Sequence, residues 1–177
     1  MPKHNEPEQD NDMPDIWSVQ INKRWQDINI LLLAYIGDAV YELWVRKHLL
    51  EQDIAKVQLM HKRAIFYVQA KTQAGILRHL MNELDETETE VVLRGRNAKG
   101  HYPRSIDVVT YRHSTAFEAL IGYWHITGQN TRMSAVLNSI DGILETMATE
   151  NNKKTERDTL PEETGKRGES EHEDHEF

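Results

Sequence analysis

The chain has 177 residues, no cysteine and a formal net charge of −8. Its length allows one domain with tails, and the absence of cysteine excludes disulfides and thiolate metal sites. The excess acid lies at the two ends, because residues 1–15 have a net charge of −4 and residues 150–177 one of −5. Residues 16–149 carry the remaining +1, so the overall charge does not exclude a polyanionic partner.

Neither the N-terminal residues nor the apolar stretches predict a membrane protein. Residues 1–15 lack the apolar core of a signal peptide. The apolar run Ile30–Ile36 has seven residues, whereas about 20 are needed to span a bilayer. We therefore expect a cytoplasmic protein with no membrane partner.

The hydrophobic pattern predicts an all-α domain over residues 23–149, between an acidic, largely disordered segment at 1–22 and an acidic disordered tail at 150–177. The predicted helices run from Asp27 or Ile28 to about Leu50, from Val57 to about Leu84 with a break near Gly75, over 85–98, from Asp107 or a later cap to Ile126, and over 131–149. In the third of these helices, Thr87 and Glu90 have the spacing of a capping box.

Asp38 follows Gly37 in the most apolar stretch of the chain, and the nearest basic residue is Arg46. A buried carboxyl group must be paired, hydrogen-bonded, bound to metal or protonated. Glu42 adds a second acid one turn further along the same helix face. The alternative is a core helix whose edge is acidic, and this stretch alone does not decide between the two.

Glu118 is another acid among apolar residues, with Gly122 one turn away. Glycines in both helices would allow a close approach that brings Asp38 and Glu118 together. Two carboxylates in one apolar site repel unless they share a proton or a cation. Mg²⁺ or Mn²⁺ fits best, because such ions combine one or two carboxylates with substrate phosphates. The alternative is a capping box of Thr115 and Glu118 at a helix start.

A basic stretch follows the third predicted helix, with five Lys or Arg against one acid between residues 91 and 113. Basic side chains and amides at a helix end and loop can contact phosphates without reading sequence. The alternative is a solvated helix end whose bases match the helix dipole. The side chains that we expect to bind a nucleic-acid backbone are Arg94, Arg96, Asn97, Lys99 and Arg104.

LAYIGDAVYE (33–42) resembles the signature helix of the ribonuclease III endonuclease domain. Three further stretches extend the resemblance to Mini-III, the short bacterial ribonuclease III relatives without a double-stranded-RNA-binding domain. They are VQLMHKRAIFYVQAKTQA (57–74), RGRNAK (94–99) and TYRHSTAFEALIGY (110–123). The resemblance covers roughly residues 24–146 and leaves out the acidic tails.

The resemblance implies a helical homodimer that cleaves double-stranded RNA with Mg²⁺, for which Mn²⁺ can substitute, leaving 5′-phosphate and 3′-hydroxyl ends. It implies a role in maturation of the large-subunit (23S) ribosomal RNA precursor, with a ribosomal protein as a candidate helper. By position, Asp38 and Glu118 are its metal-binding catalytic carboxylates, and Glu42 is a candidate outer-shell residue. Ala34 and Thr115 replace two further acids of full-length ribonuclease III, which leaves the number of metals open.

Two alternatives to an endoribonuclease belong to other functional classes. One is a catalytically silent helical RNA-binding dimer, and the other is a helical metal-dependent nucleotide hydrolase. The chain has no His-Asp dipeptide and no Glu-Glu-x-x-Glu cluster, which disfavours the nucleotide hydrolase. The presence of both Asp38 and Glu118 favours the endoribonuclease over the silent RNA-binding dimer.

Overall fold

The computed structural model describes residues 21–99 and 105–159, which contain no strand. The helices of these residues are η1 (Trp25–Asp27), α1 (Ile30–Glu51), α2 (Val57–Val68), α3 (Ala70–Leu80), η2 (Met81–Glu83), α4 (Glu86–Asn97), α5 (Val108–Ile126) and α6 (Asn130–Thr159). The predicted all-α class is confirmed. None of these helices is long and apolar enough to cross a membrane.

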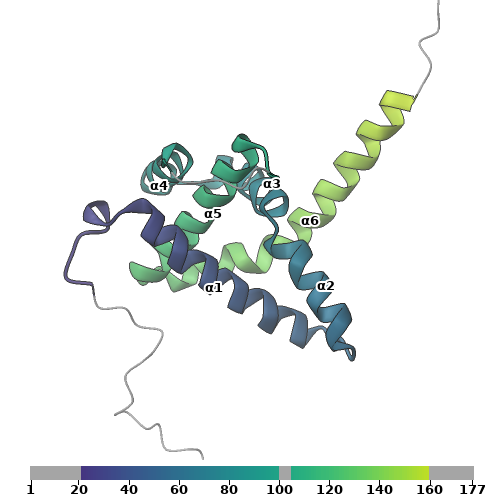
Figure 1. Ribbon diagram of the computed structural model, residues 1–177, viewed down its shortest axis with the longest axis horizontal. Helices are drawn as coiled ribbons and strands as arrows, with labels where there is room; N and C mark the ends of the chain where they lie inside the picture. The colour runs from purple at the N-terminus through teal and green to yellow at the C-terminus, as the bar shows by residue number, and fades with distance from the viewer. Residues whose placement is uncertain (1–20, 100–104, 160–177) are drawn as a thin grey trace, which may run out of the picture.

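Helix α5 is the central element, and α1, α3 and α4 make its most extensive contacts (Figure 1). Every residue from 114 to 124 is buried except Glu118, which is half-buried. Burying one large apolar side chain stabilises a fold by about 1.5–3 kcal/mol. The fully buried core includes Leu33, Tyr41, Val45, Leu49, Ile76, Leu77, Val91, Phe117, Leu120, Ile121, Trp124 and Ile140.

The first helix begins slightly later than the sequence predicts. Asn29 is the N-cap, because its side-chain oxygen accepts a hydrogen bond of 3.0 Å from the backbone N–H of Leu31. Asp27 lies in η1 and pairs instead with Arg24 at 3.0 Å. The end of the helix is close to the prediction, and Asp53 forms the following turn with a φ of 57°.

The predicted break near Gly75 is wrong, because the chain breaks at Gln69, between α2 and α3. Gln69 has extended dihedrals (φ −66°, ψ 143°) and separates the two helices. Gly75 lies inside α3, where a Cβ atom would overlap the Met147 side chain of α6. This glycine therefore makes room for a tertiary contact and does not interrupt the helix.

The capping box of α4 is formed by Asp85 and Glu88 and not by the predicted pair Thr87 and Glu90. Glu88 N–H donates to Asp85 Oδ1 at 2.7 Å, and Asp85 N–H donates to Glu88 Oε2 at 3.0 Å. Glu88 also accepts a hydrogen bond from Arg132 of α6 at 2.9 Å. A tertiary partner for the buried Glu88 carboxylate thus favours Glu88 over Glu90, an equally spaced but exposed residue.

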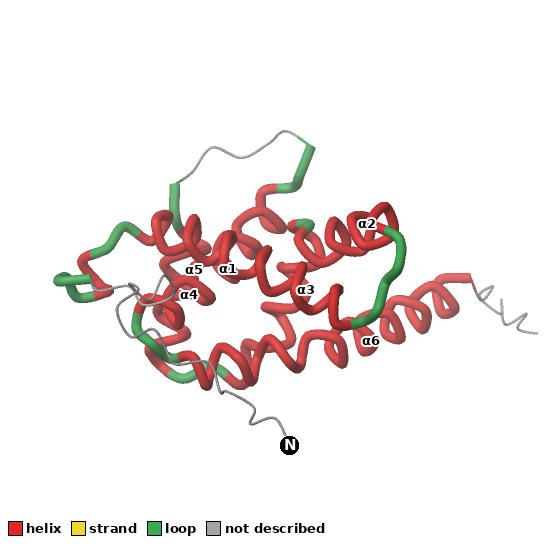
Figure 2. The backbone as a smooth tube through the Cα atoms, turned by 90° about the horizontal axis from the view of Figure 1, so that it is seen from below, coloured by secondary structure: helices red, strands yellow, loops and turns green. Residues whose placement is uncertain are grey.

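Helix α6 continues to Thr159, ten residues beyond its predicted end, so a disordered tail from residue 150 is wrong for 150–159. Its last turns extend beyond the other helices (Figure 2). The segment 150–159 contains no glycine or proline, so its charged composition does not stop the helix. The rest of the predicted tail, and residues 1–20 of the predicted N-terminal segment, lie outside the described residues.

Candidate active site

The crossing of α1 over α5 depends on one glycine from each helix. A Cβ atom on Gly37 would overlap the carbonyl oxygen of Glu118 and lie 2.6 Å from the nitrogen of Gly122. A Cβ atom on Gly122 would overlap the carbonyl oxygen of Leu33. The two backbones therefore approach more closely than any other residue would allow, as the two glycines predict.

This crossing brings the Asp38 carboxylate close enough to Glu118 to raise the pKa of that carboxyl. Burial, and then the Asp38 carboxylate, raise the pKa of Glu118 from 4.5 to about 8. Burial, and then Glu42, raise the pKa of Asp38, and Arg46 offsets part of that effect. Within the described part of the chain, neither acid forms an ion pair with a basic residue. The site therefore brings together two carboxyl groups that have no ion-pair partner among the described residues.

Gln73 of α3 adds a buried amide beside this acid pair. Only 1 % of its surface is exposed. The amide lies close enough to Glu118 to lower the pKa of that carboxyl, against the larger effects of burial and Asp38. Its Nε2 atom nevertheless meets no acceptor with hydrogen-bond geometry in the described residues. It thus presents an unpaired donor at the edge of the site.

The alternative role for Glu118 as a helix-start residue does not hold. Helix α5 begins at Val108, and its N-cap is Asp107, whose carboxylate accepts a hydrogen bond of 2.8 Å from Thr110 N–H. Thr115 is buried in the middle of the helix. Glu118 therefore lies more than two turns inside α5, where it caps nothing.

The acid pair fits a hard divalent cation. A bound cation would relieve both the desolvation and the repulsion that raise the two pKa values. Residues 21–99 and 105–159 contain no group of three or more His, Cys, Asp or Glu that could hold a metal ion. The protein would therefore supply two carboxylates, with water and substrate phosphate as the remaining ligands. Ala34 and Thr115, the positions at which full-length ribonuclease III carries acids, are both buried and add no charge.

Glu42 has a partner of its own. Its carboxylate lies 2.8 Å from the Arg46 guanidinium, one turn further along α1. It acts on Asp38 by raising the pKa of that carboxyl. An outer-shell role for Glu42 remains a prediction.

The structure gives Arg94 a structural role. Its Nη2 donates to the backbone oxygens of Gln26 and Ile28 at 3.1 and 3.2 Å, and its guanidinium lies 5.2 Å from the ring centre of Trp25. The Trp25 ring in turn packs edge-on against Tyr123 of α5. Arg94 thus holds the segment before α1 against α4, and its contact with RNA stays a prediction.

The other predicted backbone-binding residues lie at the end of α4. Asn97 and Lys99 are exposed, and Arg96 is half-buried. None of the three forms a side-chain hydrogen bond or ion pair among the described residues. Arg104 lies outside the described residues. These side chains are available for a ligand, and the predicted contacts with phosphate stay untested.

Gln73 is the residue of this site that the sequence analysis missed. It lies in the VQAKTQA stretch, which we used only for its resemblance to a family helix. A signal was present, because Gln73 lies one turn before the buried pair Ile76 and Leu77 on the same helix. A polar side chain on a core-facing position needs a partner.

Comparisons with known proteins identify the family of this chain. The ribonuclease III domain family matches residues 31–129, which include both acids. A Mini-ribonuclease 3 from Desulfitobacterium hafniense is 55 % identical over 119 residues, 67 % of this chain and 76 % of that protein. Another from Symbiobacterium thermophilum is 52 % identical over 116 residues, 65 % of this chain and 89 % of that protein. A crystal structure of a Fusobacterium nucleatum protein aligns with a TM-score of 0.63 and 32 % identity, covering 67 % of this chain and 97 % of that one. The chain therefore belongs to the ribonuclease III domain family, and within it to the Mini-ribonuclease 3 group.

Proposed function

We propose that this protein is a Mg²⁺-dependent endoribonuclease that cleaves double-stranded RNA and leaves 5′-phosphate and 3′-hydroxyl ends. The observation that carries the proposal is the acid pair, Asp38 and Glu118, at the glycine-dependent crossing of α1 and α5, where neither acid has an ion-pair partner among the described residues. The family to which the chain belongs supports the choice of RNA as substrate.

Asp38 and Glu118 would hold the Mg²⁺ ion, for which Mn²⁺ could substitute. A bound divalent ion stabilises charge on a phosphodiester and lowers the pKa of a bound water. Buried helix residues surround Glu118 on both sides along α5, so the backbone that carries its carboxylate is held in the core. Rigid placement of charge is what transition-state stabilisation requires.

The end of α4 supplies the backbone contacts in this proposal. Arg96, Asn97 and Lys99, with Arg104 beyond them, contact the phosphates and 2′-hydroxyls of the duplex across its minor groove. Arg94 supports them by fixing α4 to the segment before α1. With so few basic contacts, RNA affinity is modest, and because these contacts are with phosphates it falls as the salt concentration rises.

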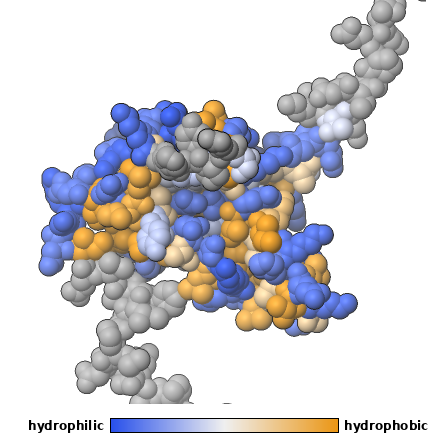
Figure 3. Space-filling model, viewed as in Figure 1, coloured by the Kyte–Doolittle hydropathy of each residue, from blue (hydrophilic) through white to orange (hydrophobic). Residues whose placement is uncertain are grey.

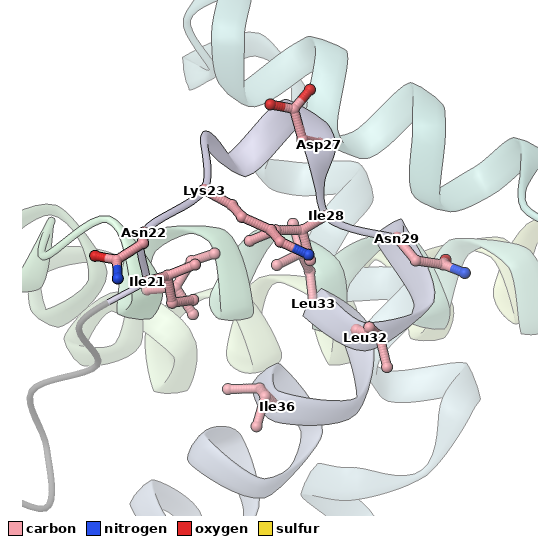
Figure 4. A pocket seen from close by; sticks show the side chains of 10 residues that line it. Ile21, Asn22, Lys23, Asp27, Ile28, Asn29, Leu32, Leu33 and Ile36 are labelled. Carbon is pink, nitrogen blue, oxygen red and sulfur yellow. The ribbon is translucent and has the colours of Figure 1, made fainter.

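The active form in this proposal is a homodimer that uses the outer face of α1. Leu32 and Tyr35 are 59 % and 76 % exposed and lie opposite the core-facing side of the helix. Apolar side chains gather over this end of α1 (Figure 3). A hollow of about 510 Å³ lies beside Leu32, and both apolar side chains such as Ile28 and charged ones such as Lys23 line it (Figure 4). A helix that is apolar on two sides is typically buried on both.

Sedimentation at micromolar concentration tests whether the protein is a dimer, and a monomer would contradict the proposal.

The proposed natural substrate is the large-subunit (23S) ribosomal RNA precursor, with a ribosomal protein as a candidate helper. A protein that contacts only the RNA backbone does not read the base sequence, so it needs RNA shape or a partner protein to select its cleavage site. Mapping the cut positions on a precursor transcript, with and without ribosomal proteins, tests this. Cuts scattered along every duplex under both conditions would argue against it.

The cleavage proposal is tested by incubating duplex RNA with the protein in Mg²⁺, in EDTA, and as Asp38→Asn in Mg²⁺. We expect cleavage only in the first reaction, with products that carry 5′-phosphates. RNA that is bound but uncut in all three would instead support a catalytically silent RNA-binding dimer.

A further inference from the structure

Gln73 is a buried polar residue whose position the fold alone does not explain. It lies in the run 72–77 of α3, all of which is buried, and α3 packs extensively against α5. Its neighbour Thr72 is satisfied, because Thr72 Oγ1 accepts a hydrogen bond of 3.1 Å from Gln69 Nε2. Gln73 Nε2 is the only buried side-chain nitrogen or oxygen of the described residues without a partner. Such an unpaired donor costs about 1–3 kcal/mol.

Glu118 is the acceptor that the geometry offers to this donor. The Gln73 amide lies near enough to the Glu118 carboxyl to influence it, although no hydrogen bond is formed. A carboxylate that binds a metal through one oxygen keeps acceptor positions on the other. Metal-bound side chains are commonly oriented by such outer hydrogen bonds. A donor to a charged carboxylate also forms a stronger bond than a donor to a neutral group.

We propose that Gln73 is a positioning residue of the metal centre, whose Nε2 donates a hydrogen bond to the Glu118 carboxylate when that carboxylate binds the cation. This inference rests on the proposed function, because it needs Glu118 to be a metal ligand. The buried amide then orients Glu118 from α3 while Asp38 approaches from α1. Three helices contribute to one site.

Gln73→Met and Gln73→Leu test this by removing the amide at similar volume. Titration with Mn²⁺, followed by electron paramagnetic resonance, measures metal affinity without RNA and without cleavage. We expect Mn²⁺ affinity to fall by about 10–100-fold in both variants. In EDTA, we expect their unfolding temperatures to be unchanged or higher than that of the unsubstituted protein, because an unpaired buried donor has been removed.

Gln69→Met is the matched control, since it removes a glutamine from the exposed junction before the same helix. We expect its Mn²⁺ affinity to be unchanged. Unchanged affinity in either folded Gln73 variant would overturn the inference, as would weaker binding accompanied by a lower unfolding temperature in EDTA in both. If the unsubstituted protein binds no Mn²⁺, the proposed metal centre itself fails, and the role of Gln73 fails with it.

Discussion

Gly37 of α1 lies directly against the backbone carbonyl of Glu118 in α5, so the residue before one candidate ligand touches the other. No side chain fits between them. The position of the acid pair is therefore built into the packing of the two helices and does not depend on a flexible loop.

Gly37→Ala should destabilise the protein by about 2 kcal/mol or more, because the new methyl group would meet backbone atoms of α5 that have little room to move. Gly142→Ala is the matched control. Nothing lies within 4 Å of a Cβ atom at that position of α6, so this change should stabilise by about 0.5–1 kcal/mol. Urea unfolding of the two variants measures both effects, and a neutral Gly37→Ala would show that the helices can separate at no cost.

The metal-free protein should lose stability as the pH rises from about 4.5 to about 8. Glu118 releases its proton near 4.5 when unfolded and near 8 when folded. Between these values the folded state binds more protons, so its stability is complete below the lower pKa and is lost through the higher one. Glu118→Gln should flatten this dependence in EDTA. Equal slopes for both proteins in urea unfolding would contradict the raised pKa of Glu118.

Arg132→Met should destabilise by about 3 kcal/mol, because it leaves a buried carboxylate without its charged partner. Burial favours the neutral form of Glu88, but hydrogen bonds from Arg132, Asp85 and Trp124 hold the pKa of this carboxyl below its usual value. Arg46→Met is the control, because it breaks the exposed pair with Glu42 and should cost less than about 1 kcal/mol. Thermal unfolding measures both losses of stability. Equal losses for Arg132→Met and Arg46→Met would show that burial of Glu88 does not make its ion pair stronger than the exposed pair.

Lys99→Ala should weaken binding of duplex RNA at low salt and reduce the salt dependence by about one phosphate contact. Its side chain is exposed at the end of α4, so the fold should be unaffected. Fluorescence anisotropy in the Asp38→Asn background measures binding without cleavage. Lys153→Ala, which removes an exposed lysine near the end of α6, should leave affinity unchanged. Equal behaviour of both lysine variants would remove the α4 end from the proposed RNA-binding surface.

The helices and the acid pair could be predicted because their signals are local. The apolar spacing of α1 and α6, the cap at Asp107 and the two glycines beside Asp38 and Glu118 are all visible in the sequence. Gly37 and Gly122 were the most informative residues. A glycine in the middle of a buried helix is costly, and a close approach of the two helix backbones explains why each helix has one.

Features that depend on tertiary partners could not be predicted. Thr87 and Glu90 match a capping box as well as Asp85 and Glu88 do, and the contact of Glu88 with Arg132 decides between them. Gly75 looks like a helix break until its contact with Met147 is known.

The same limit applies to two residues near the site. Arg94 belongs to a basic stretch in the sequence, but its partners are backbone oxygens before α1. Gln73 lies one turn before Ile76 and Leu77, which suggests a core-facing side chain, but its need for a hydrogen-bond partner becomes apparent only when its burial is known.

The most direct test of a shared acid centre is the single-turnover rate of duplex cleavage in Mg²⁺ for Asp38→Asn, Glu118→Gln and the double variant. Residues that act as one catalytic unit have strongly non-additive effects. We therefore predict that each single substitution lowers the rate about 1,000-fold or more, and that the double variant is no slower than the worse single one. Two results would contradict a centre built jointly from Asp38 and Glu118. One is a double variant whose loss of rate equals the product of the two single losses, and the other is a single variant with nearly normal activity.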